Sequence, residues 1–121
     1  MLTDEKLKQE QADEEMINQA FEHLLQSYLT SKHRRKVEII TKAFNFAKQA
    51  HKGVKRRSGE PYIMHPIAVA QIACSEIGLG STSICAALLH DVVEDTDYTV
   101  EDIENLFGPK VAQIVDGLTK I

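Results

Sequence analysis

Apolar residues recur at three- and four-residue intervals along most of the chain, which is the spacing of a buried helix face. In residues 4–30 this pattern predicts one long amphipathic helix, with an apolar stripe of Ile17, Ala20, Phe21, Leu24, Leu25 and Tyr28. The first half of that segment is nearly all polar, so we expect it to fray. We interpret this helix as a surface element without chemistry of its own.

The same spacing predicts five further helices. Gly53, Gly78 and Gly108 are expected helix ends, because glycine readily adopts the backbone conformation that terminates a helix. Thr99 and Asp102 resemble a capping box at the start of the fifth helix. The expected ranges are 32–52, 66–77, 81–91, 99–107 and 109–121. No segment alternates with the period of a strand, so the predicted fold is all-α: a helical bundle of about six helices, with an N-terminal acidic helix (1–31) and a main domain (32–121).

Composition narrows the class of protein. The chain has 121 residues, 43% of them apolar and 26% charged, which suits one small domain with one core. The net charge of −4 gives no general affinity for DNA. Cys74 and Cys85 lie in apolar patterns without a CxxC motif, so we expect buried thiols in a reducing compartment. A polar N-terminus and the lack of a long apolar run predict a cytoplasmic protein that does not enter a membrane.

The charges are unevenly distributed. Ten of the fourteen Lys and Arg residues lie between Lys32 and Arg57, whereas the region from Glu94 to Glu104 is acidic. A basic segment that faces an acidic, metal-loaded segment would suit an anionic substrate. Solvated helix faces explain the same pattern equally well.

The fourth predicted helix leads into the pair His90-Asp91, with Glu94 and Asp95 one turn further on. Adjacent helical side chains point about 100° apart, so this pair converges only if the helix frays or a metal ion lies between the two side chains. An imidazole and a carboxylate are usable ligands for a borderline divalent cation, and the later acids suit the activation of a water. The alternative is a set of solvated acids, although acids are unfavourable at a helix C-terminus.

The loop of residues 54–66 adds cations and a second imidazole. Arg56 and Arg57 present planar guanidinium groups that bind phosphate, and His65 lies at the entrance of a helix beside Pro66. Two imidazoles and one carboxylate suit Mn²⁺, Fe²⁺ or Zn²⁺ with open positions for water and substrate. This combination indicates metal-assisted hydrolysis of a phosphoester or pyrophosphate. His51, in contrast, is interpreted as a satisfied, partly buried structural histidine.

Three ordered motifs carry a resemblance to a known family. They are residues 56–66 (RRSGEPYIMHP), residues 88–96 (LLHDVVEDT), and FG at 107–108 followed by IVDGLTK at 114–120. Together they resemble the hydrolase domain of the RelA/SpoT (Rel) family, over about residues 38–121. The resemblance implies an all-helical HD domain that uses Mn²⁺ to remove the 3′-pyrophosphate of guanosine tetra- and pentaphosphate, giving GDP or GTP and pyrophosphate.

Site roles follow from this resemblance by position. His65, His90 and Asp91 match the metal ligands. Glu94 and Asp95 match the acidic pair that positions and deprotonates the attacking water. Arg56 matches the residue that packs on the guanine base, with Arg57 and Ser58 beside it in the substrate loop.

One departure affects what we expect of this chain. The family pattern closes with a further Asp ligand several dozen residues after the His-Asp pair, whereas Asp116 lies only 25 residues beyond Asp91 and matches a structural position. We therefore expect a fragment of a longer protein with synthetase and regulatory domains downstream. Such a fragment should bind Mn²⁺ weakly and hydrolyse slowly or not at all. It should also expose apolar faces that favour a homodimer, at Val111, Ile114 and Leu118.

Two other functions fit the same residues. One is an HD phosphohydrolase of another nucleotide, against which the Arg-Ser-Gly-Glu-Pro-Tyr loop argues. The other is a non-catalytic helical module that regulates or binds the alarmone; the intact Glu94 and Asp95 argue against it.

Overall fold

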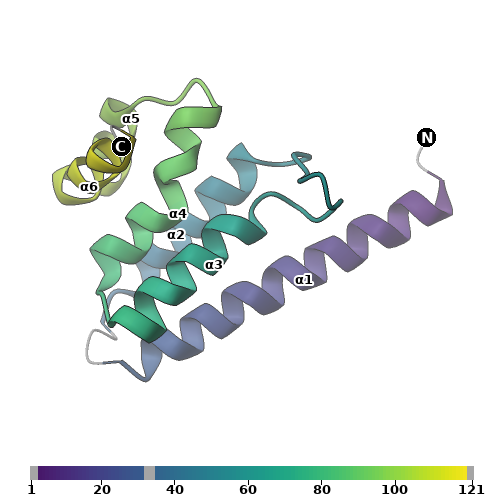
Figure 1. Cartoon of the computed structure of the whole chain (residues 1–121), viewed down its shortest axis with the longest axis horizontal. Coiled ribbons are helices and arrows are strands. Elements are labelled where there is room, and N and C mark those ends of the chain that lie inside the picture. Colours follow the sequence, from purple (N-terminus) through teal and green to yellow (C-terminus); the bar gives the residue numbers. More distant parts are fainter. Residues whose placement is uncertain (1–2, 32–34, 120–121) are drawn as a thin grey trace.

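The computed structural model describes residues 3–31 and 35–119 and contains six α-helices and one π-helical turn in that part of the chain (Figure 1). The predicted all-α fold is confirmed, since the only strand-like feature among the described residues is an isolated bridge between Lys55 and Pro61. In chain order the elements are α1 (Asp4–Leu29), α2 (Val37–Ala50), α3 (Met64–Ile72), η1 (Ala73–Ile77), α4 (Ser81–Asp95), α5 (Val100–Phe107) and α6 (Pro109–Thr119).

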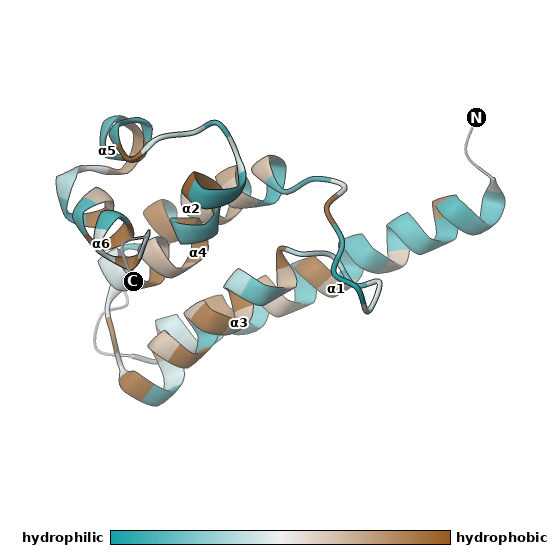
Figure 2. Ribbon diagram, turned by 45° about the horizontal axis from the view of Figure 1, so that its top comes forward, coloured by the Kyte–Doolittle hydropathy of each residue, from teal (hydrophilic) through white to brown (hydrophobic). Residues whose placement is uncertain are grey.

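Helix α1 is the longest element, and its first half extends beyond the other helices (Figure 1). Figure 2 shows that this half is hydrophilic. In the structure this half is helical from Asp4 onward, and the Thr3 hydroxyl caps it by accepting a hydrogen bond from the Lys6 amide. The second half belongs to the core through four buried residues, Ile17, Phe21, Leu24 and Tyr28.

Helix α4 lies at the centre of the fold. Every residue from Ile84 to Leu89 is buried, and the helix contacts α2, α3 and α6. Such all-round burial explains why its sequence is apolar on every side. The helix continues to Asp95 rather than ending at the His-Asp pair, so Glu94 and Asp95 occupy its last turn.

Three details near the helix ends test the sequence pattern. The capping box of Thr99 and Asp102 is confirmed, with both reciprocal hydrogen bonds present. Helix α3 begins at Met64, two residues before the proline that was expected to open it. It runs into the π-helical turn and stops at Gly78, whose φ of 80° lies in the left-handed region.

Surface and core assignments were partly correct. Cys74 and Cys85 are buried and unpaired, as predicted. Of the apolar residues expected on an exposed face of α6, Ile114 and Leu118 are exposed, whereas Val111 is buried against the core. None of the helices in the described ranges combines the length and apolar character needed to span a bilayer.

Candidate functional site

The Asp91 carboxylate is the point where three separate segments meet. It is buried on α4, and its Oδ2 accepts a 2.8 Å hydrogen bond from the Tyr62 hydroxyl of the preceding loop. The Nε2 atom of His90 lies 3.1 Å from Oδ1, and the Nε2 atom of His65, in the first turn of α3, lies 4.0 Å from Oδ2. The structure therefore brings together all three residues that the sequence predicted as metal ligands.

The hydrogen bonding of His90 prepares it to act as a ligand. Its Nδ1 atom lies 2.8 Å from the Ala87 carbonyl oxygen, which only accepts hydrogen bonds, so Nδ1 carries a hydrogen. The Nε2 atom faces Oδ1 of Asp91 and would offer its lone pair to a metal ion placed between the two atoms. Backbone contacts of this kind fix the ring orientation of metal-binding histidines.

The separations around Asp91 also suit a shared ion. Ligand atoms at about 2.1 Å from one metal ion lie between about 3 and 4.2 Å from each other. Both imidazole-to-carboxylate distances, 3.1 and 4.0 Å, fall in that range. Nevertheless, no group of three His, Cys, Asp or Glu side chains within residues 3–31 and 35–119 is already arranged around one point as a metal site. The donor set fits a metal ion chemically, but its convergence is incomplete.

Tyr62 is a site residue that the sequence analysis missed. Besides its hydrogen bond to Asp91, its ring lies against His51 and His65, with centroid distances of 4.9 and 5.9 Å. Burial and the hydrogen bond to Asp91 raise the pKa of Tyr62, so the hydroxyl remains a donor. Its position three residues before His65 was the available signal, since metal-bound carboxylates are themselves usually hydrogen-bonded.

His51 was predicted to be satisfied and only partly buried, and both parts of that prediction are wrong. Its side chain is almost fully buried beside Tyr62, and its Nε2 atom has no hydrogen-bond partner in the structure. That atom lies 3.5 Å from Oδ2 of Asp95. The two residues meet because α2 and α4 end at the same side of the bundle.

The two acids after the His-Asp pair differ in their surroundings. Asp95 lies four residues after Asp91 and therefore on the same face of α4. Its side chain is 47% exposed and is next to His51. Glu94 is exposed on the last turn of the helix. Both side chains are open to solvent at the edge of the Asp91 cluster, which we define as Asp91 with Tyr62, His65 and His90. This exposure suits contact with a water or substrate.

The arginine loop forms a tight turn. The Gly59 amide donates to the Arg56 carbonyl over 2.8 Å, which places Arg57 and Ser58 at the exposed tip. Gly59 has a φ of 92°, a conformation that favours glycine. Arg56 also lies 3.4 Å from Glu60 as an exposed ion pair. The predicted substrate-binding residues thus share one turn, outside the cluster around Asp91.

A buried acid of α1 holds the base of this loop. Asp13 forms a 2.6 Å ion pair with Lys55 and accepts a 2.9 Å hydrogen bond from Gln9. The hydrogen bond from Lys55 lowers the pKa of Asp13, against burial, which raises it. Helix α1 was predicted to have no chemistry of its own, and its contribution here is to position the residue next to Arg56.

We expect Asp13→Asn to lower the free energy of unfolding by about 1 kcal/mol at neutral pH. The pKa of Asp13 is lower in the folded chain than its ordinary value of 3.8. The stabilisation of the folded state by ionised Asp13 is therefore complete above pH 3.8 and is lost as the pH falls through the lower pKa of Asp13 in the folded chain. Urea unfolding of both proteins at several pH values measures this, with the difference shrinking below about pH 4. Glu14→Gln, in the more exposed pair with Lys48, is the matched control, and a larger loss there would contradict the assignment.

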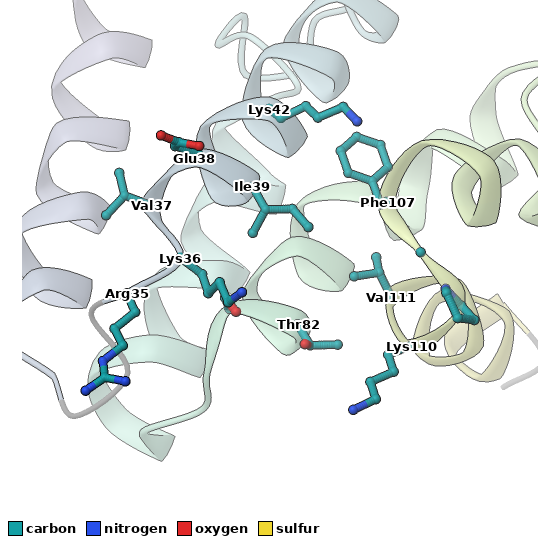
Figure 3. A pocket seen from close by; sticks show the side chains of 13 residues that line it. Arg35, Lys36, Val37, Glu38, Ile39, Lys42, Thr82, Phe107, Lys110 and Val111 are labelled. Atoms are coloured by element: carbon teal, nitrogen blue, oxygen red, sulfur yellow. The ribbon is translucent and has the colours of Figure 1, made fainter.

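The basic region is divided between two ends of α2. Arg56 and Arg57 lie beyond its C-terminus, whereas Arg35 and Lys36 precede it and Lys42 lies in its first half. The last three line a groove of about 880 Å³ together with Lys110 (Figure 3). Lys42 is engaged there by the Leu106 carbonyl and the Phe107 ring. Among the described basic residues, Lys42 therefore packs on the end of α5, whereas Arg56 and Arg57 share a loop with Tyr62, the partner of Asp91. Lys32 and Arg34 lie outside the described residues.

Comparison with known proteins agrees with this geometry. Residues 43–121 match the HD domain family. The guanosine-3′,5′-bis(diphosphate) 3′-pyrophosphohydrolase of Aquifex aeolicus is 48% identical over 93 residues, covering 77% of this chain and 13% of that protein. The bifunctional (p)ppGpp synthase/hydrolase SpoT of Escherichia coli K12 is 44% identical over 103 residues, covering 85% of this chain and 14% of that protein. The probable GTP pyrophosphokinase of Mycobacterium leprae is 51% identical over 85 residues, covering 70% of this chain and 11% of that protein.

A solved structure gives the same result. It is described as a metazoan ortholog of SpoT that hydrolyzes ppGpp, and it matches with a TM-score of 0.61 and 38% identity, covering 65% of this chain and 46% of that one. The chain spans about one seventh of the length of the curated relatives. The family resemblance inferred from the three motifs is confirmed. The chain belongs to the HD domain family, as the HD domain of the RelA/SpoT (p)ppGpp hydrolases.

Proposed function

We propose that this domain removes the 3′-pyrophosphate of guanosine tetra- and pentaphosphate in a Mn²⁺-dependent reaction, giving GDP or GTP and pyrophosphate. The observation that supports the proposal most is the buried Asp91 carboxylate with an imidazole on either side and Tyr62 fixing it. The relatives named as 3′-pyrophosphohydrolases support the substrate. We place the activity in the cytoplasm, as part of a longer protein with synthetase and regulatory domains.

His65, His90 and Asp91 would hold the Mn²⁺ ion. When bound, the ion supplies Lewis-acid stabilisation and acidifies a coordinated water. Asp95 and Glu94 accept and hold the proton of the attacking water at the solvent-facing end of α4.

The loop residues bind the rest of the substrate. Arg56 packs on the guanine base, because a planar guanidinium stacks on aromatic rings. Arg57 and Ser58, at the exposed tip of the turn, contact the phosphates through charge-assisted hydrogen bonds. This division of roles predicts that base and phosphate recognition come from the same four-residue turn.

Pyrophosphate release tests the proposal. The purified chain is incubated with Mn²⁺ and either guanosine tetraphosphate, its adenosine counterpart, or guanosine nucleotides without a 3′-pyrophosphate. We expect slow release, and only from the 3′-pyrophosphorylated guanosine nucleotides. Equal turnover of the adenosine compound would instead favour an HD phosphohydrolase of another nucleotide.

A non-catalytic alarmone-binding domain is the second candidate. It is favoured by the incomplete convergence of the three donors within the described parts of the chain. Calorimetric binding of guanosine tetraphosphate without pyrophosphate release, at saturating Mn²⁺, would support it. The proposed homodimer, through exposed Ile114 and Leu118, is checked separately by sedimentation.

We expect Tyr62→Phe to weaken Mn²⁺ binding or turnover by about 10- to 100-fold, as loss of a hydrogen bond to a metal-binding carboxylate typically does. The ring remains against His51 and His65, so only the hydrogen bond to Asp91 is removed. Isothermal titration with Mn²⁺ measures the change. Tyr98→Phe, at a 43% exposed position packed on Phe46, serves as the control and should have no effect.

A further inference from the structure

The buried imidazole of His51 ends in an unpaired nitrogen. The residue is 3% exposed at the C-terminal end of α2, and its Nε2 atom is a fully buried polar atom without a hydrogen bond. The other ring nitrogen, Nδ1, lies 3.2 Å from the Ala47 carbonyl oxygen. Because buried polar atoms in folded proteins are almost always paired, the free Nε2 calls for an explanation.

The geometry limits where hydrogens lie. The Ala47 carbonyl only accepts hydrogen bonds, so Nδ1 carries a hydrogen. The Nε2 atom then faces Oδ2 of Asp95 at 3.5 Å, and a carboxylate is also an acceptor. A lone pair opposite a carboxylate is repulsive, whereas one proton between the two atoms makes the contact attractive.

We propose that His51 is a positioning residue that orients the Asp95 carboxylate through a proton shared between Nε2 and Oδ2. Without it, the 47% exposed side chain of Asp95 is free to change rotamer at the end of α4. Since Asp95 is assigned to the attacking water, this inference rests on the proposed function.

His51 and Tyr62 then form one layer on the buried side of Asp91 and Asp95 of α4. Their rings are in contact at a centroid distance of 4.9 Å, Tyr62 donates to Asp91, and His51 faces Asp95 one helical turn later. Each carboxylate thus has its own partner from the segment between the end of α2 and the start of α3. A substrate-facing acid is held from its buried side, while its other side stays open to solvent.

Nitrogen NMR of the imidazole tests the contact directly and needs no turnover. Two-bond ¹H–¹⁵N spectra distinguish ring nitrogens with and without a hydrogen. In the wild-type chain, we expect both nitrogens of His51 to give hydrogen-bearing signals. In Asp95→Asn, the Nε2 signal should move to that of a hydrogen-free nitrogen, while Nδ1 stays unchanged. Asp97→Asn, which removes an exposed acid two residues later, is the matched control and should leave both signals in place.

Two substitutions of His51 separate a loss of Asp95 orientation from a loss of folding. His51→Gln places an amide near Nε2, where it donates to Asp95, and His51→Asn places one near Nδ1, where it donates only to the Ala47 carbonyl. We expect His51→Asn to lower kcat by about 10- to 100-fold with little change in KM, and His51→Gln to recover most of that loss. Thermal unfolding checks that both variants fold.

The outcomes are distinguishable. An Nε2 signal that is the same in wild type and Asp95→Asn would overturn the inference, as would a kcat for His51→Asn equal to that of His51→Gln. If the wild-type chain releases no pyrophosphate, the proposed function fails for this chain, and the NMR comparison alone decides whether His51 holds Asp95.

Discussion

Replacing Asp91 by asparagine is expected to reduce Mn²⁺ binding by more than about 100-fold and to abolish detectable pyrophosphate release. Asparagine keeps the size of the side chain and an oxygen that accepts the Tyr62 hydrogen bond. It removes the negative charge that two imidazoles approach at 3.1 and 4.0 Å. A carboxylate attracts a divalent cation more strongly than a neutral amide oxygen does, so the asparagine variant should bind Mn²⁺ more weakly.

The location of Asp91 is the reason for so large an effect. Asp91 is 7% exposed and is the carboxylate that both His65 and His90 approach in the described part of the chain, so its loss leaves the two imidazoles without an anionic partner. Calorimetry with Mn²⁺ and a pyrophosphate assay measure the two losses on the same sample. Unfolding by urea, followed in parallel, confirms that the variant remains folded.

Asp97→Asn is the matched control for this prediction, because it removes the same charge from an exposed position just beyond α4. It should change Mn²⁺ binding by less than about twofold, since exposed charges are screened by salt. If Asp91→Asn and Asp97→Asn weaken binding equally, the loss reflects general electrostatic attraction and the assignment of Asp91 as a ligand is wrong.

Sequence periodicity predicted the helices well because burial follows the helical repeat in this chain. The stripe of α1 and the all-apolar character of α4 both match the observed core. The ends were less predictable. Helix α4 extends through Glu94 and Asp95 although acids disfavour a C-terminal turn, because Val92 remains fully buried and keeps that turn packed.

The site was predictable where side chains have a strong chemical signature. His65 and the His90-Asp91 pair lie close together in the structure, as the ordered family motifs implied. Tyr62 and His51 were not found, because each resembles an ordinary core residue in sequence. Their importance depends on distances between α2, the loop and α4, which only tertiary packing determines.

The same packing that places these residues should be sensitive to the centre of α4. Leu88 is fully buried, two residues before His90, on the helix that contacts α2, α3 and α6. Leu88→Ala removes several methyl and methylene groups and leaves a cavity, which typically costs about 2–5 kcal/mol. Domains of this size have a total stability of about 5–15 kcal/mol, so the variant should lose a large part of it.

Guanidinium unfolding of the metal-free chain measures this loss separately from ligand binding. Leu88→Met, which nearly conserves volume, should cost less than about 1.5 kcal/mol. Leu79→Ala, at a 39% exposed position before α4, should change stability by no more than about 0.5 kcal/mol. A loss below about 1 kcal/mol for Leu88→Ala would mean that α4 is not the central packing element. In that case the positions of His90 and Asp91 would have to be set by the loop and α3, because the His-Asp pair has no other rigid support.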